Sequence, residues 1–368
     1  MKIGDLCTYA PKSSIKAGDA IIDGRYMFFT SSSDENKRYS DYQLDCEGII
    51  MGTGGNATLH YYNGKFATST DCVVLLSNET IRCKYLYYFF LSNMDILESG
   101  FKGVGLKHTN KNYINSINIS SVPSFEMQDR VIKVLDKVQS IIDKRKKQLS
   151  KLDELVKSRF VELFGNPISN PMKWDIYQLE ECLERIDNGK SLICSDKPRN
   201  GDNPAILKLS AATYGDYRPN ENKALLDESL FVESSEVHAG DLLFTRKNTP
   251  ELVGTAAYVQ NTPPKLMMPD LIFRLVPNEK VNAVFLWQLI NCKEFRPVIQ
   301  AISGGSAKSM SNISKERLGK IKVICPPREL QDSLIPFVKR VDKSKFEIKQ
   351  SLEKLELLKK ALMQKYFG

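Results

Sequence analysis

The 368-residue sequence lacks most of the residue clusters that chemistry at a protein site requires. It has only three histidines, His60, His108 and His238, and its eight cysteines are scattered without a Cys-x-x-Cys pair. Zinc-ligand spacing is therefore absent. The histidines have no acidic, serine or cysteine companions at a recognisable spacing, so we expect no nucleophilic triad. We expect the thiols to be reduced core residues, since a disulfide framework is unusual in a long chain without an export signal.

Nucleotide-binding and membrane-spanning patterns are also missing. There is no G-x-x-x-x-G-K-[ST] loop, GTGG and GVGL do not complete G-x-G-x-x-G, and the Asn/Asp-Pro-Pro-aromatic tetrapeptide of adenine methyltransferases does not occur. The longest apolar run, Tyr85–Leu91, is far shorter than a membrane span and predicts a buried helix or strand. Because Met1 leads into KIGDLCTYAP without an apolar stretch, we expect a cytoplasmic protein with no membrane partner.

What the sequence does contain is a long internal repeat. A shift of 203 residues aligns two helical segments without a gap, so that Pro123 meets Pro326, Gln128 meets Gln331, and Phe164–Gly165 meets Phe367–Gly368. Upstream the order is kept more loosely: IGDLCTY matches LEECLER, CEGIIMGTGG matches HAGDLLFTRKN, KYLYYFFL matches AVFLWQLI, and ESGFKGVGLKHTN matches ISGGSAKSMSN. A period this long indicates domain duplication, not a solenoid.

The repeat predicts an α+β chain of two mixed α/β domains, residues 1–122 and 166–325. Each domain would run through short strands and helices, a glycine-rich loop, a short strand and a proline into one long helix, 123–165 and 326–368. Two Asn-Pro steps in GNPISNPMKW end the first helix, with Gly165 at the C-cap position.

Apolar residues recur every three or four positions along both long helices, which is the seam of a coiled coil. Each helix would be about 55 Å long, more than a small domain can cover, so we expect an antiparallel pair with the globular units at opposite ends of a rod. Packing of each stripe on its own domain is the alternative. The predicted seam residues are Val131, Leu135, Val138, Ile142, Leu149, Leu152, Leu334, Val338, Val341, Ile348, Leu352 and Leu355.

Polar side chains that suit nucleic-acid binding gather in loops that also contain glycine. Arg, Lys, Asn and Ser carry the donors that contact base edges and phosphates, and a net charge of +8 permits a polyanionic partner. Ordinary solvated loops are the alternative for each. The candidates are Lys65, Lys102, Lys107, Asn110, Lys111, Arg199, Asn200, Tyr214, Arg218, Arg246, Lys247, Asn248, Ser306, Lys308 and Ser309, with Arg246 as a base contact and Lys308 as a phosphate contact.

Three features together resemble the specificity (S) subunit of type I restriction-modification systems. They are the segment LDELVKSRFVELFGNP (residues 152–167), the P-x-x-x-x-Q start of each long helix, and the duplicated plan. The resemblance covers the whole chain, is specific in the helices and is weak in the globular parts. One departure is that the first domain has no counterpart of the NPMKW lead that opens the second.

The resemblance implies a division of labour between subunits. Two target recognition domains would each bind one half of a bipartite double-stranded DNA site, and two spacer helices in an antiparallel coiled coil would set the unread gap. Two methylation subunits would bind S-adenosylmethionine and modify adenine, while restriction subunits would use ATP and Mg²⁺ to translocate and cut DNA. The chain itself would bind no cofactor and would not be an enzyme.

Two other readings are kept open. One is a coiled-coil adaptor whose globular ends bind protein, which a salt-dependent gel shift on DNA would distinguish. The other is a fused DNA methyltransferase with unrecognised motifs, which would methylate DNA without partners.

Overall fold

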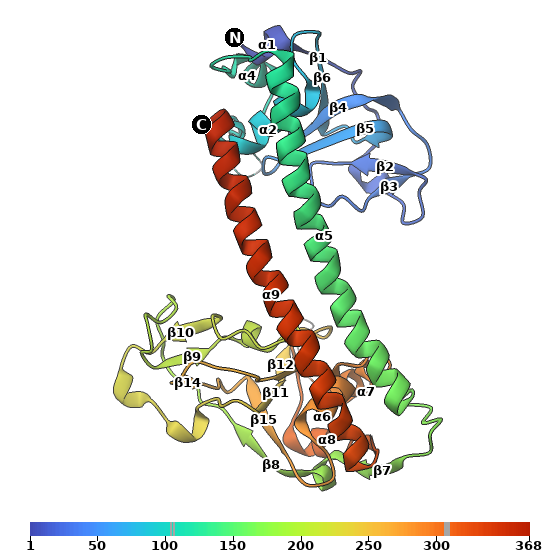
Figure 1. The fold of residues 1–368 in the computed structure, drawn as a ribbon, viewed down its shortest axis with the longest axis vertical. Helices are drawn as coiled ribbons and strands as arrows, with labels where there is room; N and C mark the ends of the chain where they lie inside the picture. The colour runs from blue at the N-terminus through green and yellow to red at the C-terminus, as the bar shows by residue number, and fades with distance from the viewer. Residues whose placement is uncertain (104, 106, 305–309) are drawn as a thin grey trace. The chain divides into compact units, whose positions relative to one another are not determined.

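The computed structural model describes residues 1–103, 105, 107–304 and 310–368. The chain divides into two compact units: unit 1 is Met1–Gln148 with Ile348–Gly368, and unit 2 is Leu149–Glu347. Two 40-residue helices, α5 (Phe125–Phe164) and α9 (Arg328–Phe367), each contribute residues to both units (Figure 1).

Unit 1 is built on a six-stranded sheet of order β1-β6-β4-β5-β2-β3. Neighbouring strands are antiparallel except β2 and β5, which run parallel. The elements before α5 are α1 (Ile3–Leu6), β1 (Cys7–Tyr9), η1 (Ala17–Asp19), β2 (Tyr26–Phe29), β3 (Arg38–Tyr39), β4 (Leu44–Gly52), β5 (Leu59–Thr68), β6 (Cys72–Ser77), α2 (Cys83–Ser92), α3 (Met94–Ser99) and α4 (Lys111–Ser116).

The unit 1 core lies between this sheet and α2. Strand side chains alternate between the two faces of a sheet, so Ile49 and Leu75 pack with Leu86 and Phe90 of α2, while the neighbouring Ile50 packs on the opposite face. The apolar run Tyr85–Leu91 is therefore a buried helix. Its predicted burial is confirmed, and the choice between helix and strand is settled.

Unit 2 contains a four-stranded sheet of order β13-β11-β15-β8, in which every pair is antiparallel. A three-stranded sheet, β10-β9-β14, and the pairs β12–β16 and β17–β7 complete the strands. The elements between α5 and α9 are β7 (Asp175–Gln178), η2 (Leu179–Cys182), β8 (Leu183–Asn188), β9 (Ala205–Leu207), η3 (Leu209–Ala211), β10 (Asn222–Ala224), η4 (Glu228–Leu230), η5 (Glu233–Ser235), β11 (Leu242–Thr245), β12 (Lys247–Asn248), β13 (Ala256–Tyr258), β14 (Leu266–Met267), β15 (Ile272–Pro277), α6 (Ala283–Asn291), α7 (Arg296–Ala301), β16 (Ser311–Asn312), α8 (Lys315–Gly319) and β17 (Lys322–Cys325).

The two units share one four-strand core, which confirms the predicted duplication. The neighbours β1-β6-β4-β5 in unit 1 correspond to β8-β15-β11-β13 in unit 2. The registers agree: Ile49 pairs with Tyr61 and Leu75, and Leu242 pairs with Tyr258 and Leu275. In both units a buried helix, α2 or α6, packs on the same face of this core.

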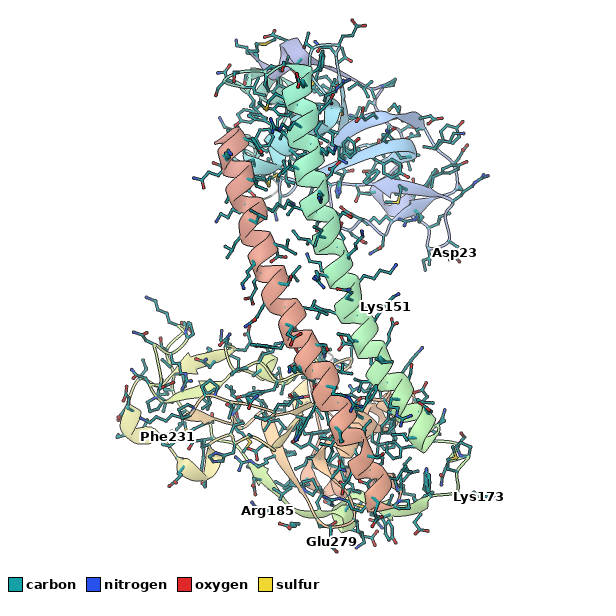
Figure 2. The ribbon with its side chains drawn as sticks, viewed as in Figure 1. Asp23, Lys151, Lys173, Arg185, Phe231 and Glu279 are labelled. Carbon is teal, nitrogen blue, oxygen red and sulfur yellow. The ribbon has the colours of Figure 1, made fainter. Side chains whose placement is uncertain are left out.

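The segment between the first and second core strands of each unit, here called the insert, differs between them. In unit 1 the insert (residues 10–43) adds β2 and β3 to the edge of the core sheet. In unit 2 the insert (residues 189–241) supplies β9 and β10 of a separate sheet, whose Ala205 and Leu207 pack on Leu243 of β11. Figure 2 labels Asp23 in the first insert and Phe231 in the second.

One predicted element differs between the units. The short strand expected before each long helix is β17 in unit 2, which pairs with β7 over four residues. In unit 1 it is reduced to a single bridge between Lys2 and Asn118. The prediction of a strand there was wrong, because the segment around Asn118 pairs at one residue only and a single bridge does not make a ladder.

The repeated glutamine explains where the long helices start. Gln331 is fully buried; its Oε1 accepts a hydrogen bond from the N-cap residue of α6, Asn282 N, at 2.9 Å, and its Nε2 donates to Pro326 O at 2.8 Å and Lys280 O at 2.9 Å. Gln128 likewise accepts from Arg82 N at 2.7 Å, before α2, and donates to Pro123 O at 2.8 Å. Each glutamine thus satisfies buried backbone groups that neither helix satisfies internally.

The two long helices pair antiparallel inside each unit, as predicted. In unit 1, Lys359 Nζ donates to Gln139 Oε1 at 2.6 Å, and Lys146 lies 3.5 Å from Glu356. In unit 2, Lys345 Nζ lies 2.6 Å from Asp153 Oδ1. Residue numbers therefore rise along α5 as they fall along α9. Lys345 interrupts the apolar seam between Val341 and Ile348. Its ion pair with Asp153 joins the two helices there, and such pairs help to fix the register of coiled coils.

Part of each apolar stripe also packs on the helix's own domain, which was the alternative to pairing of the two helices. Val131 and Leu135 belong to the unit 1 core, and Leu334, Val338 and Val341 belong to the unit 2 core. Of the other predicted seam residues, Val138 and Ile142 are buried, whereas Leu149, Leu152, Ile348, Leu352 and Leu355 are half-buried. The stripe thus serves both the helix pair and the domains.

The repeated helix ends fasten each long helix into a domain core. Phe164 is fully buried, 5.0 Å from Phe285 of α6 between ring centroids. Its repeat partner Phe367 lies 5.1 Å from Tyr85 of α2. Burial of such a side chain contributes about 2 kcal/mol. Gly165 ends α5 at a φ of 73°, which glycine adopts without strain, so the predicted C-cap is confirmed.

Candidate DNA interface

Each unit folds a glycine-rich loop against the residue that follows its central strand. In unit 2 the ends of the loop, Gly304 and Asn312, exchange two backbone hydrogen bonds of 2.8 Å, and Ile313 N donates to Arg246 O after β11 at 2.8 Å. In unit 1, Lys102 and His108 exchange two of 3.0 Å, and Thr109 N donates to Thr53 O after β4 at 3.0 Å. The two loops therefore occupy equivalent places at the same end of the core sheet.

In unit 2 the described loop segments that contain the predicted contacts are joined by buried amides. Asn248 Nδ2 donates to Thr213 Oγ1 at 3.1 Å, and β12 pairs with β16 at the end of the glycine-rich loop. Asn222 is 4% exposed; it accepts from Arg199 N at 2.9 Å and donates to Pro219 O at 2.8 Å. Segments that are far apart in sequence thus contact one another.

Arg246 is held in place yet remains partly exposed. Its Nε and Nη2 both lie 3.3 Å from Asn312 Oδ1, and its guanidinium lies 4.9 Å from the ring centroid of Phe273. An arginine that is already oriented loses less entropy when it contacts a base edge. The neighbouring Lys247 is also partly exposed. This pair is therefore well placed for the predicted contacts.

Two predicted contacts have internal partners instead. The Arg199 side chain is only 7% exposed, and its Nη1 donates to Pro264 O at 2.6 Å and to Asn203 O at 3.3 Å. Asn248 is buried, with its Oδ1 accepting from Thr249 N at 2.9 Å in addition to the bond to Thr213. Both side chains fasten loops together, which leaves them little surface to offer DNA.

Tyr214 and Arg218 form an exposed aromatic and cationic pair. The guanidinium of Arg218 lies 4.6 Å from the Tyr214 ring centroid, and its Nε lies 3.0 Å from Asp216 Oδ1. Tyr214 is 58% exposed, and Asn200 is also exposed. A cation stacked on a tyrosine next to a basic loop suits contact with phosphate or a sugar edge.

The unit 1 candidates fall into two separate places. Lys102, Lys107 and Lys111 are exposed at the glycine-rich loop, with Lys111 Nζ 4.4 Å from the Tyr9 ring centroid. Asn110 caps α4 by accepting from Tyr113 N at 3.0 Å.

Lys65 pairs with Asp45 at the other end of the β4–β5 ladder, about 20 Å away at the strand rise per residue. There its Nζ lies 4.6 Å from the ring centroid of Tyr42. The predicted Ser306, Lys308 and Ser309 lie outside the described residues.

Some residues that position these loops were not predicted from the sequence. Arg296 of α7 donates from Nη2 to Val253 O at 2.6 Å and from Nη1 to Gly254 O at 2.5 Å, and burial lowers its pKa. It holds the segment that follows β12. Gln128 and Gln331 were noticed only as parts of a repeat. The repeat was a usable signal for the two glutamines, because a buried polar residue kept in both copies needs partners. No such signal marks Arg296.

Among the described residues, no cluster of three or more His, Cys, Asp or Glu side chains could hold a metal ion. Over the same residues, no helix is both long and apolar enough to cross a membrane.

The architecture is thus a duplicated α+β scaffold whose copies are followed by long antiparallel helices. A model of the type I restriction modification DNA specificity domain matches residues 1–154 and again residues 171–359, so the chain belongs to that family. Its members recognise DNA sequence.

Similar proteins are described as specificity subunits of type I restriction enzymes. The specificity subunit of the type I restriction enzyme EcoEI from Escherichia coli is 31% identical over 189 residues, which is 51% of this chain and 32% of that protein. The MjaVIII specificity subunit of Methanocaldococcus jannaschii is 23% identical over 334 residues, 86% of this chain and 76% of that protein. The chain therefore spans about a third of the length of the first relative and three quarters of the second.

Solved structures share the fold along the whole chain. The crystal structure of a type I restriction-modification S subunit from M. genitalium has a TM-score of 0.65 at 14% identity, covering 100% of this chain and 95% of that chain. A structure from work on the assembly and conformational transition of the type I restriction-modification system has a TM-score of 0.52 at 15% identity, covering 100% and 96%.

Proposed function

We propose that this chain is the recognition subunit of a type I restriction-modification complex and reads a bipartite DNA target. The observation that carries the proposal is the four-strand core, which occurs twice. In each copy, a glycine-rich loop whose sequence contains lysine packs against the residue that follows the central strand. The inserts beside these loops differ between the units. One scaffold with two different sets of loops suits two half-sites of different sequence.

The chemistry of the loops supports DNA as the ligand. Arg246 offers the forked donors that contact guanine in the major groove. The exposed Lys102, Lys107 and Lys111 suit phosphate contacts. The paired long helices would set the length of DNA between the half-sites.

Two methylation subunits are the proposed direct partners. Leu155 and Leu358 are repeat partners 203 residues apart, and each is 47% exposed on its helix. A duplicated exposed apolar position suits two copies of one partner that bind in equivalent ways. The partners would bind S-adenosylmethionine and methylate adenine; restriction subunits with ATP and Mg²⁺ would cut DNA. The chain itself would bind no cofactor, catalyse neither step, and act in the cytoplasm on cellular or invading DNA.

Reconstitution with the methylation subunit tests this proposal. We expect the complex to shift a duplex carrying its target, with affinity that falls as salt rises because phosphate contacts release counterions. We expect the labelled methyl group of S-adenosylmethionine to be transferred to DNA, with release of S-adenosylhomocysteine, only when the methylation subunit is present. Methyl transfer by the chain alone would instead favour a fused methyltransferase. A complex without any salt-dependent shift would favour a protein adaptor.

A further inference from the structure

Unit 1 contains a pocket of about 540 Å³ that the proposed DNA-binding loops do not use. Tyr61 of β5 and Tyr87 and Leu91 of α2 line one wall. Lys144 and Lys147 of α5 line another, with Lys359 of α9 beside them. All of its lining residues belong to unit 1. The pocket therefore lies within one compact unit.

The equivalent place in unit 2 can be located from the shared strand register. Tyr61 pairs with Ile49 as Tyr258 pairs with Leu242. The ring centroids of Tyr61 and Tyr87 are 5.6 Å apart, and those of Tyr258 and Trp287 are 6.1 Å apart. The aromatic wall of the pocket is therefore duplicated.

In unit 2 this wall is covered by the chain's own insert. Trp287 Nε1 donates to Gly215 O at 2.8 Å. The Gly215 backbone has a φ of 83°. A Cβ placed on Gly215 would lie 3.7 Å from Nδ2 of Asn291, the residue of α6 that corresponds to Leu91 of α2. A polypeptide loop thus presents a backbone carbonyl to the aromatic wall. In unit 1, no described residue of the insert lines the pocket.

The charges of the unit 1 pocket leave an excess of cations. Lys84 lies 2.8 Å from Asp136, which also accepts from the Tyr88 hydroxyl at 2.6 Å. Lys144 and Lys147 have no ion pair with any residue in the described part of the chain. They lie three positions apart, on one face of α5. The carboxylate of Asp143 also lines the pocket. Burial lowers the pKa of Lys359, and the nearby Asp143 opposes that shift.

We propose that an acidic loop of the methylation subunit docks in this pocket. Its backbone would lie against Tyr87 as Gly215 lies against Trp287, and its carboxylate would accept hydrogen bonds from Lys144 and Lys147. Charge-assisted bonds of this kind are stronger than neutral ones. The identity of the partner rests on the proposed function, whereas the chemistry of the occupant rests on the duplicated wall and the unpaired lysines.

Two pairs of variants test the docking. Ser140→Trp fills the pocket from an exposed position of α5, and Lys133→Trp is its control at an exposed position of the same helix outside the pocket. Lys144→Glu with Lys147→Glu reverses the charge, and Lys133→Glu with Lys137→Glu makes the same change of charge elsewhere on the helix. Affinity for the purified methylation subunit is measured by calorimetry. DNA affinity is measured separately, at saturating methylation subunit.

We expect both pocket variants to bind one of the two methylation subunits at least about tenfold more weakly and the other as before, because only unit 1 leaves the aromatic wall uncovered. The controls should bind both within about twofold of wild type. DNA affinity of the saturated complex should stay within about twofold. A photocrosslinker at position 140 should capture an acidic segment of the methylation subunit. Unchanged assembly in both pocket variants would overturn the inference while leaving the proposed function intact. Loss of DNA affinity alone would identify phosphate as the occupant and also overturn it. A wild-type chain that does not bind the methylation subunit would overturn both.

Discussion

Unit 1 and unit 2 use one core scaffold and differ in what they attach to it. The four-strand core, the helix on its inner face and the glutamine that starts each long helix agree in register or contact. The inserts differ. The unit 1 insert extends the core sheet, whereas the unit 2 insert supplies strands of a second sheet that packs on one face of the core sheet. The shared parts therefore carry the fold and the helix pair, and the variable parts surround the proposed reading loops.

The difference also extends into the cores. Position 274 of β15 is an arginine that pairs across the ladder with Leu243, whereas the matching position of β6 is Val74, which pairs with Ile50. A second sheet lies over this face in unit 2, and the backbone of the insert supplies an acceptor: Arg274 Nη2 donates to Glu236 O. An insert can thus change the chemistry of the scaffold beneath it.

The largest predicted effect comes from lengthening both long helices together. Seven residues inserted after Leu149 and seven after Leu352 add about 10 Å to each helix. We expect the unread gap to grow by about three base pairs, with both half-sites unchanged and affinity for the original target reduced by about 10³. Adenine methylation mapping reads out the target. Insertion into one helix alone is the control, and should disrupt folding because the pairing register is lost. Altered half-site bases would refute the spacer role.

Arg274→Met should destabilise unit 2 by about 3 kcal/mol, because it removes the cation that pairs with the largely buried carboxylate of Asp241. Arg274 Nε lies 3.1 Å from Asp241, whose pKa burial raises despite this charge. Without the arginine that pKa should rise further. A carboxyl with a raised pKa destabilises the fold once it ionises, so the deficit should be full at neutral pH and shrink as the pH falls through the folded-state pKa.

Urea unfolding at pH 7.5 and pH 4.5 measures this deficit. Adding Asp241→Asn to the arginine variant should restore part of the lost stability at neutral pH. An equal deficit at both pH values would show that the arginine contributes through packing and not through its charge.

Truncating the repeated glutamines should affect unit 2 more than unit 1. Gln331→Ala removes three hydrogen bonds of 2.8 to 2.9 Å, whereas one of the three made by Gln128 is 3.5 Å long. Unsatisfied buried groups cost about 1–3 kcal/mol, so we expect losses of about 3 and 2 kcal/mol. Scanning calorimetry measures both. Glu329→Ala and Glu126→Ala, exposed repeat partners on the same turns, should be nearly neutral. Equal losses would refute the ranking.

Smaller effects should separate base contacts from phosphate contacts in the loops. Arg246→Ala should cost about 1–3 kcal/mol on the cognate duplex and relax specificity at one position. Lys107→Ala should weaken binding on all duplexes alike and flatten the salt slope by about one. Salt titrations of the methylation complex on cognate and scrambled duplexes measure both. Arg199→Ala should reduce stability, because its donors hold backbone carbonyls. Wild-type affinity in the Arg246 and Lys107 variants would leave these loops without a role in DNA binding.

The sequence predicted the parts of the fold that local periodicity determines. Both long helices, their seam and the glycine stop were predicted because steps of three and four and a C-cap glycine are local signals. The absence of a strand before α5 in unit 1 was not predicted, since strand formation depends on a partner elsewhere in the chain. The structures of the two inserts could not be predicted either, because the inserts do not align with each other in the repeat.

The candidate site was predicted at the level of loops and not of side chains. Composition identified the right kind of segment, and the fold brings the described loop segments of unit 2 together. Composition could not reveal that Arg199 bonds to Pro264 or Asn248 to Thr213, because those contacts join residues 65 and 35 positions apart. Nor could it place Lys65 at the far end of its ladder. The domain boundaries and the DNA contacts themselves remain predictions.

The central claim is that each unit reads its own half of the target. Replacing residues 174–325 with the matching segment of a relative, and mapping adenine methylation in a host genome by single-molecule sequencing, tests it most directly. We predict that one half-site changes to that of the relative, while the other half-site and the gap stay as they were. A target altered in both halves, or in neither, would contradict the account.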